Sequence, residues 1–175
     1  YNSAEDPDEK LGYLRNLIQL SAQAENWSDL QKYANMMLES DLAEGKKPEG
    51  ADFFYKEEAY YFLSNAAETQ EDFEKAVDYL ETGYKAFPKS YFSSDMLLKI
   101  GVIYLTKLNT VPDALDISAH YFEQYINNFP NTPNAEMAHY YLGFCFYNGR
   151  RFDEAVKTFG SFARKYPSSE FTPEA

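Results

Sequence analysis

The amino-acid sequence repeats itself, and this internal repeat restricts the possible folds more than any other feature. The pattern Phe-x-x-Ala-Val-x-x-Leu at residues 73–80 recurs at residues 152–159 as Phe-x-x-Ala-Val-x-x-Phe, and residues 118–130 carry a partial third copy. Apolar residues at these spacings share one face of an α-helix. Each copy ends in an aromatic residue followed by proline, at 87–88, 129–130 and 166–167. Because proline cannot continue a helix, three helices are predicted to end there.

Another apolar helix is predicted to precede each of these copies, and the first 42 residues form a weaker copy of the same unit. The predicted helices lie near residues 8–23, 27–41, 53–69, 71–87, 92–108, 111–129, 134–147 and 151–166. No segment alternates between polar and apolar residues as a strand does. Paired helices that cannot bury their apolar faces alone predict an all-α solenoid.

Local signals refine the turns between these helices. Pro112 and Asp113 suit the first turn of the helix that is predicted to begin near residue 111. Asn148-Gly149 is predicted to supply a left-handed stop after the seventh helix, and Gly45 to Gly50 a loop. The adjacent acids at 57–58 lie near a helix start, where the helix dipole favours negative charge.

The repeat resembles the tetratricopeptide repeat family. The matching positions are Leu142-Gly143, Phe146, Ala155, Phe159 and Pro167 in the last copy, and Leu63, Ala67, Ala76, Leu80 and Pro88 in the second. The resemblance covers nearly the whole chain and implies a right-handed α-α superhelix. We expect one domain, residues 1–175, of about four helix-turn-helix repeats near 8–42, 53–88, 92–130 and 134–167. Residues 168–175 are expected to begin a further helix or a tail.

The units are longer than the 34 residues usual for this family. This length, and endings such as Phe-Pro-Asn-Thr-Pro-Asn-Ala-Glu, are similar to bacterial cell-envelope repeat proteins, such as the lipoprotein subunit of the outer-membrane barrel-assembly machine and the division coordinator of the Tol-Pal system. The resemblance implies a periplasmic or outer-membrane-associated protein, with a cytoplasmic one as the alternative. The N-terminus given has no signal region, and no apolar run is long enough to span a membrane, so no direct membrane insertion of this segment is expected.

In this family, ligands usually occupy a concave groove lined by the first helices of successive repeats. Carried over by position, the candidate groove residues are Arg15, Gln19, Tyr61, Asn65, Tyr140 and Phe144. Aromatic rings supply contact area, and amides pair with backbone groups, so these residues suit a peptide or a partner helix. Leu98 and Val102 occupy the corresponding places in the third repeat and are expected to pack internally. Since a clamp for chaperone tails needs basic residues there, no such clamp is predicted.

Composition excludes other classes of function. The net charge is −12, which argues against nucleic acid and against an anionic membrane surface. A single cysteine excludes an intrachain disulfide and a cysteine-built metal site. His139 and Cys145 are expected in the core, and neither they nor His120 forms a catalytic or metal-ligand pattern. We therefore expect neither an enzyme nor a cofactor.

The sequence thus predicts a non-catalytic scaffold that binds a protein or peptide partner. Two alternatives remain open: a carbohydrate- or peptidoglycan-recognition module, suggested by the 16 tyrosines, and an accessory domain of a larger enzyme. Residues 1–70 are acidic and residues 150–167 are mildly basic. Self-association through the end repeats is therefore a further possibility.

Overall fold

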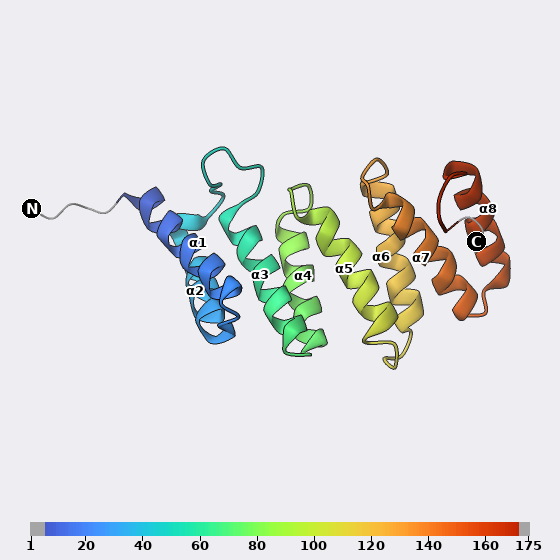
Figure 1. Ribbon diagram of the computed structural model, residues 1–175, viewed down its shortest axis with the longest axis horizontal. Coiled ribbons are helices and arrows are strands. Elements are labelled where there is room, and N and C mark those ends of the chain that lie inside the picture. Colours follow the sequence, from blue (N-terminus) through green and yellow to red (C-terminus); the bar gives the residue numbers. More distant parts are fainter. Residues whose placement is uncertain (1–5, 172–175) are drawn as a thin grey trace, which may run out of the picture. The chain divides into compact units, whose positions relative to one another are not determined.

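The computed structural model describes residues 6–171, and within this range it contains eight α-helices, one short 3₁₀ helix and no strand (Figure 1). The all-helical class predicted from the repeat is therefore confirmed. The chain divides into two compact units, residues 1–96 and residues 97–175. The last residues of the predicted C-terminal tail, 172–175, lie outside the described residues.

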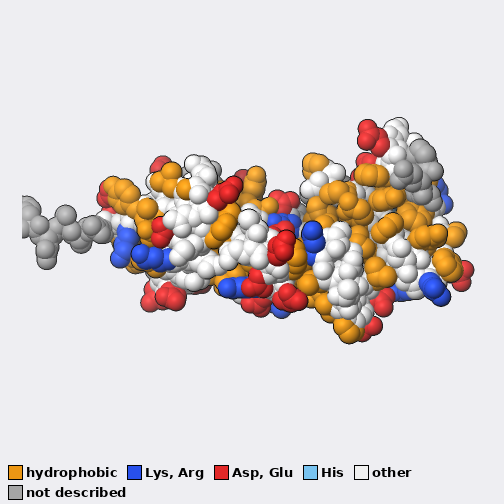
Figure 2. Space-filling model, turned by 60° about the horizontal axis from the view of Figure 1, so that its bottom comes forward, with side chains coloured by type: hydrophobic (Ala, Val, Ile, Leu, Met, Phe, Trp, Pro, Cys, Tyr) orange, Lys and Arg blue, Asp and Glu red, His pale blue; other side chains and the backbone are white. Residues whose placement is uncertain are grey.

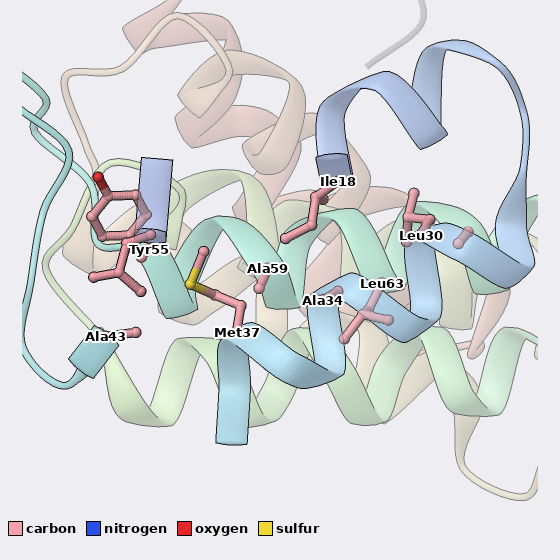
Figure 3. Close-up of a cluster of buried hydrophobic side chains, with 10 residues drawn as sticks. Ile18, Leu30, Ala34, Met37, Ala43, Tyr55, Ala59 and Leu63 are labelled. Atoms are coloured by element: carbon pink, nitrogen blue, oxygen red, sulfur yellow. The ribbon is translucent and has the colours of Figure 1, made fainter. Parts of the chain in front are cut away.

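The N-terminal unit is built from two helix pairs. Its elements are α1 (Pro7–Gln23), α2 (Trp27–Glu39), the 3₁₀ helix η1 (Asp41–Ala43), α3 (Tyr55–Thr69), α4 (Phe73–Ala86) and the start of α5 (Ser93–Thr106). Helix α2 packs against both α1 and α3. Figure 3 shows Leu30, Ala34 and Met37 of α2 in one cluster with Ala59 and Leu63 of α3. The first, weaker copy of the repeat is therefore a packed helix pair like the second.

The C-terminal unit contains the rest of α5, followed by α6 (Ala114–Asn128), α7 (Ala135–Asn148) and α8 (Phe152–Lys165). Helix α7 packs against α6 and α8. Glycines on the first helix of each pair make room for a ring from the second helix. A Cβ atom on Gly101 would lie 2.8 Å from the Phe122 ring, and one on Gly143 would lie 2.6 Å from the Phe159 ring. The small residue in the repeat pattern is thus needed for close helix packing.

Two local predictions were wrong. Helix α6 begins at Ala114 rather than near 111, because Asp113 has a left-handed conformation with φ of 60° and acts as the N-cap. Gly149 has φ of −74°, and the left-handed residue in that turn is Arg150, with φ of 59°. Glu25 and Glu71 take the same conformation, with φ of 52° and 60°, in the corresponding turns of the first two repeats. The turn geometry is therefore repeated even though none of these residues is a glycine.

Candidate functional site

Arg15 and Gln19, on α1, both bind one carboxylate of α3. The Arg15 Nε lies 2.6 Å from Oε2 of Glu58, and its Nη2 lies 3.0 Å from Oε1. The Gln19 amide donates to the same Oε1 at 3.1 Å. Glu58 is buried, and its hydrogen bond raises the pKa of Arg15. A paired buried carboxylate holds both side chains in place, so these two candidate residues are pre-positioned by contacts within the unit.

Tyr61 and Asn65 lie one turn apart on α3 and are both half-buried. The Tyr61 ring stacks on Phe92, with 4.7 Å between ring centroids and 23° between planes. Burial raises the pKa of the Tyr61 hydroxyl, which is protonated at neutral pH even with the ordinary pKa of tyrosine. The structure thus leaves part of Tyr61 accessible, while Phe92 covers one face of its ring.

Tyr140, on α7, repeats this arrangement in the C-terminal unit. Its ring stacks on Phe171 with a centroid distance of 4.7 Å and an angle of 22°. Tyr61 and Tyr140 occupy equivalent positions in their repeats. Phe92 and Phe171 are also equivalent, because each lies four residues after the proline that ends a repeat, Pro88 or Pro167. In both tyrosines, one face of the ring is therefore covered by a phenylalanine of the same unit.

A glutamate accepts hydrogen bonds at the junction next to each stacked pair, and of the two glutamates only Glu57 was considered in the sequence analysis, as an acid near a helix start. Oε1 of Glu57 accepts the backbone N–H of Phe92 at 2.6 Å and the Ser90 hydroxyl. Glu136 accepts the Ser169 hydroxyl in the equivalent place. The sequence does contain a pattern that could have indicated this junction. A serine or threonine lies two positions after each repeat-ending proline, at Ser90, Thr132 and Ser169.

An apolar hollow of about 710 Å³ lies between α7 and α8 and includes two of the predicted residues, Tyr140 and Phe144. The complete lining is Tyr140, Phe144, Tyr147, Phe152, Ala155, Val156, Phe159, Gly160 and Ala163. None of these side chains is charged. The α8 residues of this set were not predicted as site residues, because their repeat positions indicate packing.

Large apolar side chains around the hollow are exposed to solvent. The exposed fractions are 39% for Phe144, 58% for Tyr147, 56% for Phe152 and 72% for Val156. Figure 2 shows hydrophobic side chains gathered on one face of the C-terminal unit. A contiguous exposed apolar patch of this kind marks an interaction surface more often than isolated apolar residues do. Leu98 is buried and Val102 is half-buried, as expected for residues that pack internally.

Cys145 and His139 are part of the core, as expected, whereas His120 is exposed. Cys145 is buried and donates to the Ser118 hydroxyl at 3.3 Å, and burial raises the pKa of its thiol to about 11. His139 is buried against Phe162, and burial lowers the pKa of its imidazole. Among residues 6–171, no group of three His, Cys, Asp or Glu side chains is arranged to hold a metal ion. Nor does any helix in this range have the length and apolarity to cross a membrane.

Solved structures with the same fold are tetratricopeptide proteins. MamA (AMB-1) has a TM-score of 0.61 at 16% identity, over 93% of this chain and 76% of that one. YrrB, described as a TPR protein with an unusual peptide-binding site, has a TM-score of 0.61 at 19% identity, over 88% and 68%. A putative kinesin light chain from Podosopora anserina, with nearly identical TPR-like repeats, has a TM-score of 0.61 at 11% identity, over 94% and 78%. The resemblance recognised in the sequence is therefore confirmed at the level of the fold.

A comparison with curated proteins finds no match. The family described as "YfiO: Outer membrane lipoprotein" matches residues 54–175, which is more than half of the chain. The match includes α3 to α8 and so contains the hollow between α7 and α8. The chain therefore belongs to the YfiO outer membrane lipoprotein family.

Proposed function

We propose that this protein is a non-catalytic interaction scaffold of the bacterial cell envelope, which binds a helix or extended peptide from another protein molecule. The observation that carries the proposal is the apolar hollow between α7 and α8, with its exposed rings. Membership of an outer membrane lipoprotein family supports the envelope location. The tetratricopeptide fold of MamA and YrrB supports a role as a scaffold.

The chemistry of the hollow favours an apolar segment as the ligand. Aromatic side chains provide large contact areas at a low loss of conformational entropy, and they dominate the binding energy of many protein interfaces. The hollow has no charged lining residue to fix a charged substrate, and its volume admits several side chains rather than one. An amphipathic helix that inserts residues from successive turns would meet these requirements.

A second contact region is proposed on the first helices of the N-terminal unit. Tyr61 and Asn65 offer a hydroxyl and an amide one turn apart, next to the Arg15 and Gln19 pair that Glu58 holds. Asparagine and glutamine amides can pair with the backbone of an extended peptide. This region would bind the backbone of a peptide through polar contacts of the N-terminal unit alone.

Site-specific photo-crosslinking tests the proposal. A photoreactive amino acid at Phe144, which is 39% exposed, is expected to crosslink to a protein partner in cells of the native bacterium. The same group at the exposed Asn35 of α2 is the control. Adding Val156→Glu should abolish the Phe144 crosslink without changing the thermal unfolding of the protein, because Val156 is 72% exposed. Equal crosslinking from both positions, or none from Phe144, would contradict the proposal.

A further inference from the structure

Helix α1 carries an exposed apolar stripe. Tyr13, Leu17 and Leu20 are 63%, 40% and 60% exposed, and their spacing places them on one face of the helix. Alignment of the first two repeats makes these residues equivalent to Ala59, Leu63 and Ala66 of α3, which are 1%, 1% and 0% exposed.

The equivalent face of α3 shows what such a stripe packs against. Ala59 and Leu63 lie in one cluster with Leu30 and Ala34 of α2, the second helix of the preceding repeat (Figure 3). Ala66 belongs to the same cluster. In the interior of the chain, the first helix of one repeat therefore covers the second helix of the repeat before it. Helix α1 has the apolar face for this contact but, within the described residues, no preceding repeat.

Helix α8 has the complementary surface. Val156 is 72% exposed, whereas Val77, at the equivalent position of α4, is only 5% exposed. Small residues line the hollow beside it, and a Cβ on Gly160 would meet only the Arg164 guanidinium, at 3.7 Å. The side chains on α1 are larger than the alanines of α3, and this hollow has the space to accept them.

The charges at the N-terminus of α1 and at the C-terminus of α8 are complementary. Consecutive helices joined by short loops pack antiparallel, so a helix that covers α8 in the same way would place its N-terminus beside the C-terminus of α8. Helix α1 begins with the acids Asp6, Asp8 and Glu9, all exposed, and α8 ends with exposed Arg164 and Lys165. Opposite charges would therefore meet in this arrangement.

From these observations we infer that the hollow of one molecule binds α1 of a second copy of this chain, so that copies associate head to tail. The inference rests on the proposed function and names the partner helix for that surface. The two surfaces are different, so the contact is heterologous, and each added copy leaves one α1 face and one α8 face open. The assembly is thus a growing series of oligomers rather than a closed symmetric dimer.

Two variants and their mixture test the inference in sedimentation velocity with the purified chain. The average mass of the unmodified chain should rise with concentration up to about 1 mM, a range that detects weak contacts. Leu20→Glu and Val156→Glu, at exposed positions on the two faces, should each be monomeric, because a buried unpaired carboxylate opposes the contact. An equimolar mixture of the two should form a dimer, since each variant supplies the face that the other lacks.

A matched control distinguishes this contact from nonspecific association through exposed apolar residues. Met36→Glu changes a 49% exposed apolar residue of α2 that lies on neither face, and it should leave the association unchanged. A monomer at every concentration, a symmetric dimer, or a mixture that stays monomeric would overturn the inference. Monomeric protein that still crosslinks to another protein through Phe144 would leave the proposed function standing, so the two failures are distinguishable.

Discussion

Replacing Glu57 with alanine should destabilise the N-terminal unit more than any exposed acid would. The side chain of Glu57 is completely buried, at 0% exposed. Its carboxylate accepts the backbone N–H of Phe92 at 2.6 Å and that of Phe54 at 3.1 Å. It also accepts the Ser90 hydroxyl. The first bond fixes the loop that leads into α5, and the second caps the N-terminus of α3.

The magnitude follows from the groups that lose their acceptor. A buried donor left unsatisfied costs about 1–3 kcal/mol, and the loss is larger when the acceptor is charged. Ser90 keeps a bond to the Phe87 carbonyl at 2.8 Å, so its hydroxyl adds little to the loss. Phe54 and Phe92 are half-buried, which lets water replace part of what they lose. The expected decrease in the free energy of unfolding is therefore about 2–4 kcal/mol.

Urea unfolding followed by tryptophan fluorescence measures this change in the relevant unit, since the sole tryptophan, Trp27, lies in α2. With a denaturant dependence of about 2 kcal/mol per molar, the midpoint should fall by roughly 1–2 M. The exposed Glu39, at the end of α2, provides a matched control, and Glu39→Ala should change stability by less than about 0.5 kcal/mol. A loss below about 1 kcal/mol for Glu57→Ala would refute the reasoning, because the buried donors would then have found other partners.

Three further predictions concern packing and titration. Gly143→Ala should cost about 1–3 kcal/mol in circular-dichroism unfolding, because its Cβ would lie 2.6 Å from the Phe159 ring; Gly12→Ala, with nothing within 4 Å, should instead stabilise by up to about 1 kcal/mol. The Cys145 thiol, with a pKa raised to about 11, should resist alkylation at pH 8 in the folded protein and react fully in urea; rapid labelling of the folded protein would contradict its burial. His139 has a pKa below its unfolded value of 6.5, so the unfolded state binds the proton first and stability should fall as the pH drops below about 6.5. His139→Gln should lose less stability than the unmodified protein between pH 7.5 and 5.5, and equal losses would contradict this account.

Most of the fold could be predicted from the sequence because the repeats share a pattern of apolar residues and the last three end at a proline. Helices α4 and α8 share one apolar pattern and are each followed by an aromatic residue and a proline, so their faces and ends could be identified without coordinates. Predicted helix bounds agree with the structure to within about three residues. The errors fall on turns: Asp113 and Arg150 adopt left-handed conformations that a search for glycine does not find.

The candidate site was predicted less completely. The repeat pattern gave the rows of first-helix residues, and Tyr140 and Phe144 do lie together at an apolar hollow. Sequence reasoning did not foresee that Glu58 holds Arg15 and Gln19, nor that Phe92 stacks on Tyr61. These contacts join residues tens of positions apart, and nothing in the local pattern states which partner each one meets.

The sequence by itself determined the all-α class, the pairing of helices and the face that each helix turns inward, because helix periodicity and proline positions are local properties. Only the tertiary structure decided which equivalent residues stay exposed. Val77 and Val156 occupy the same place in the repeat, yet one is 5% exposed and the other 72%. The difference arises because burial depends on what packs against a face, and a repeat pattern specifies the face without specifying its neighbour.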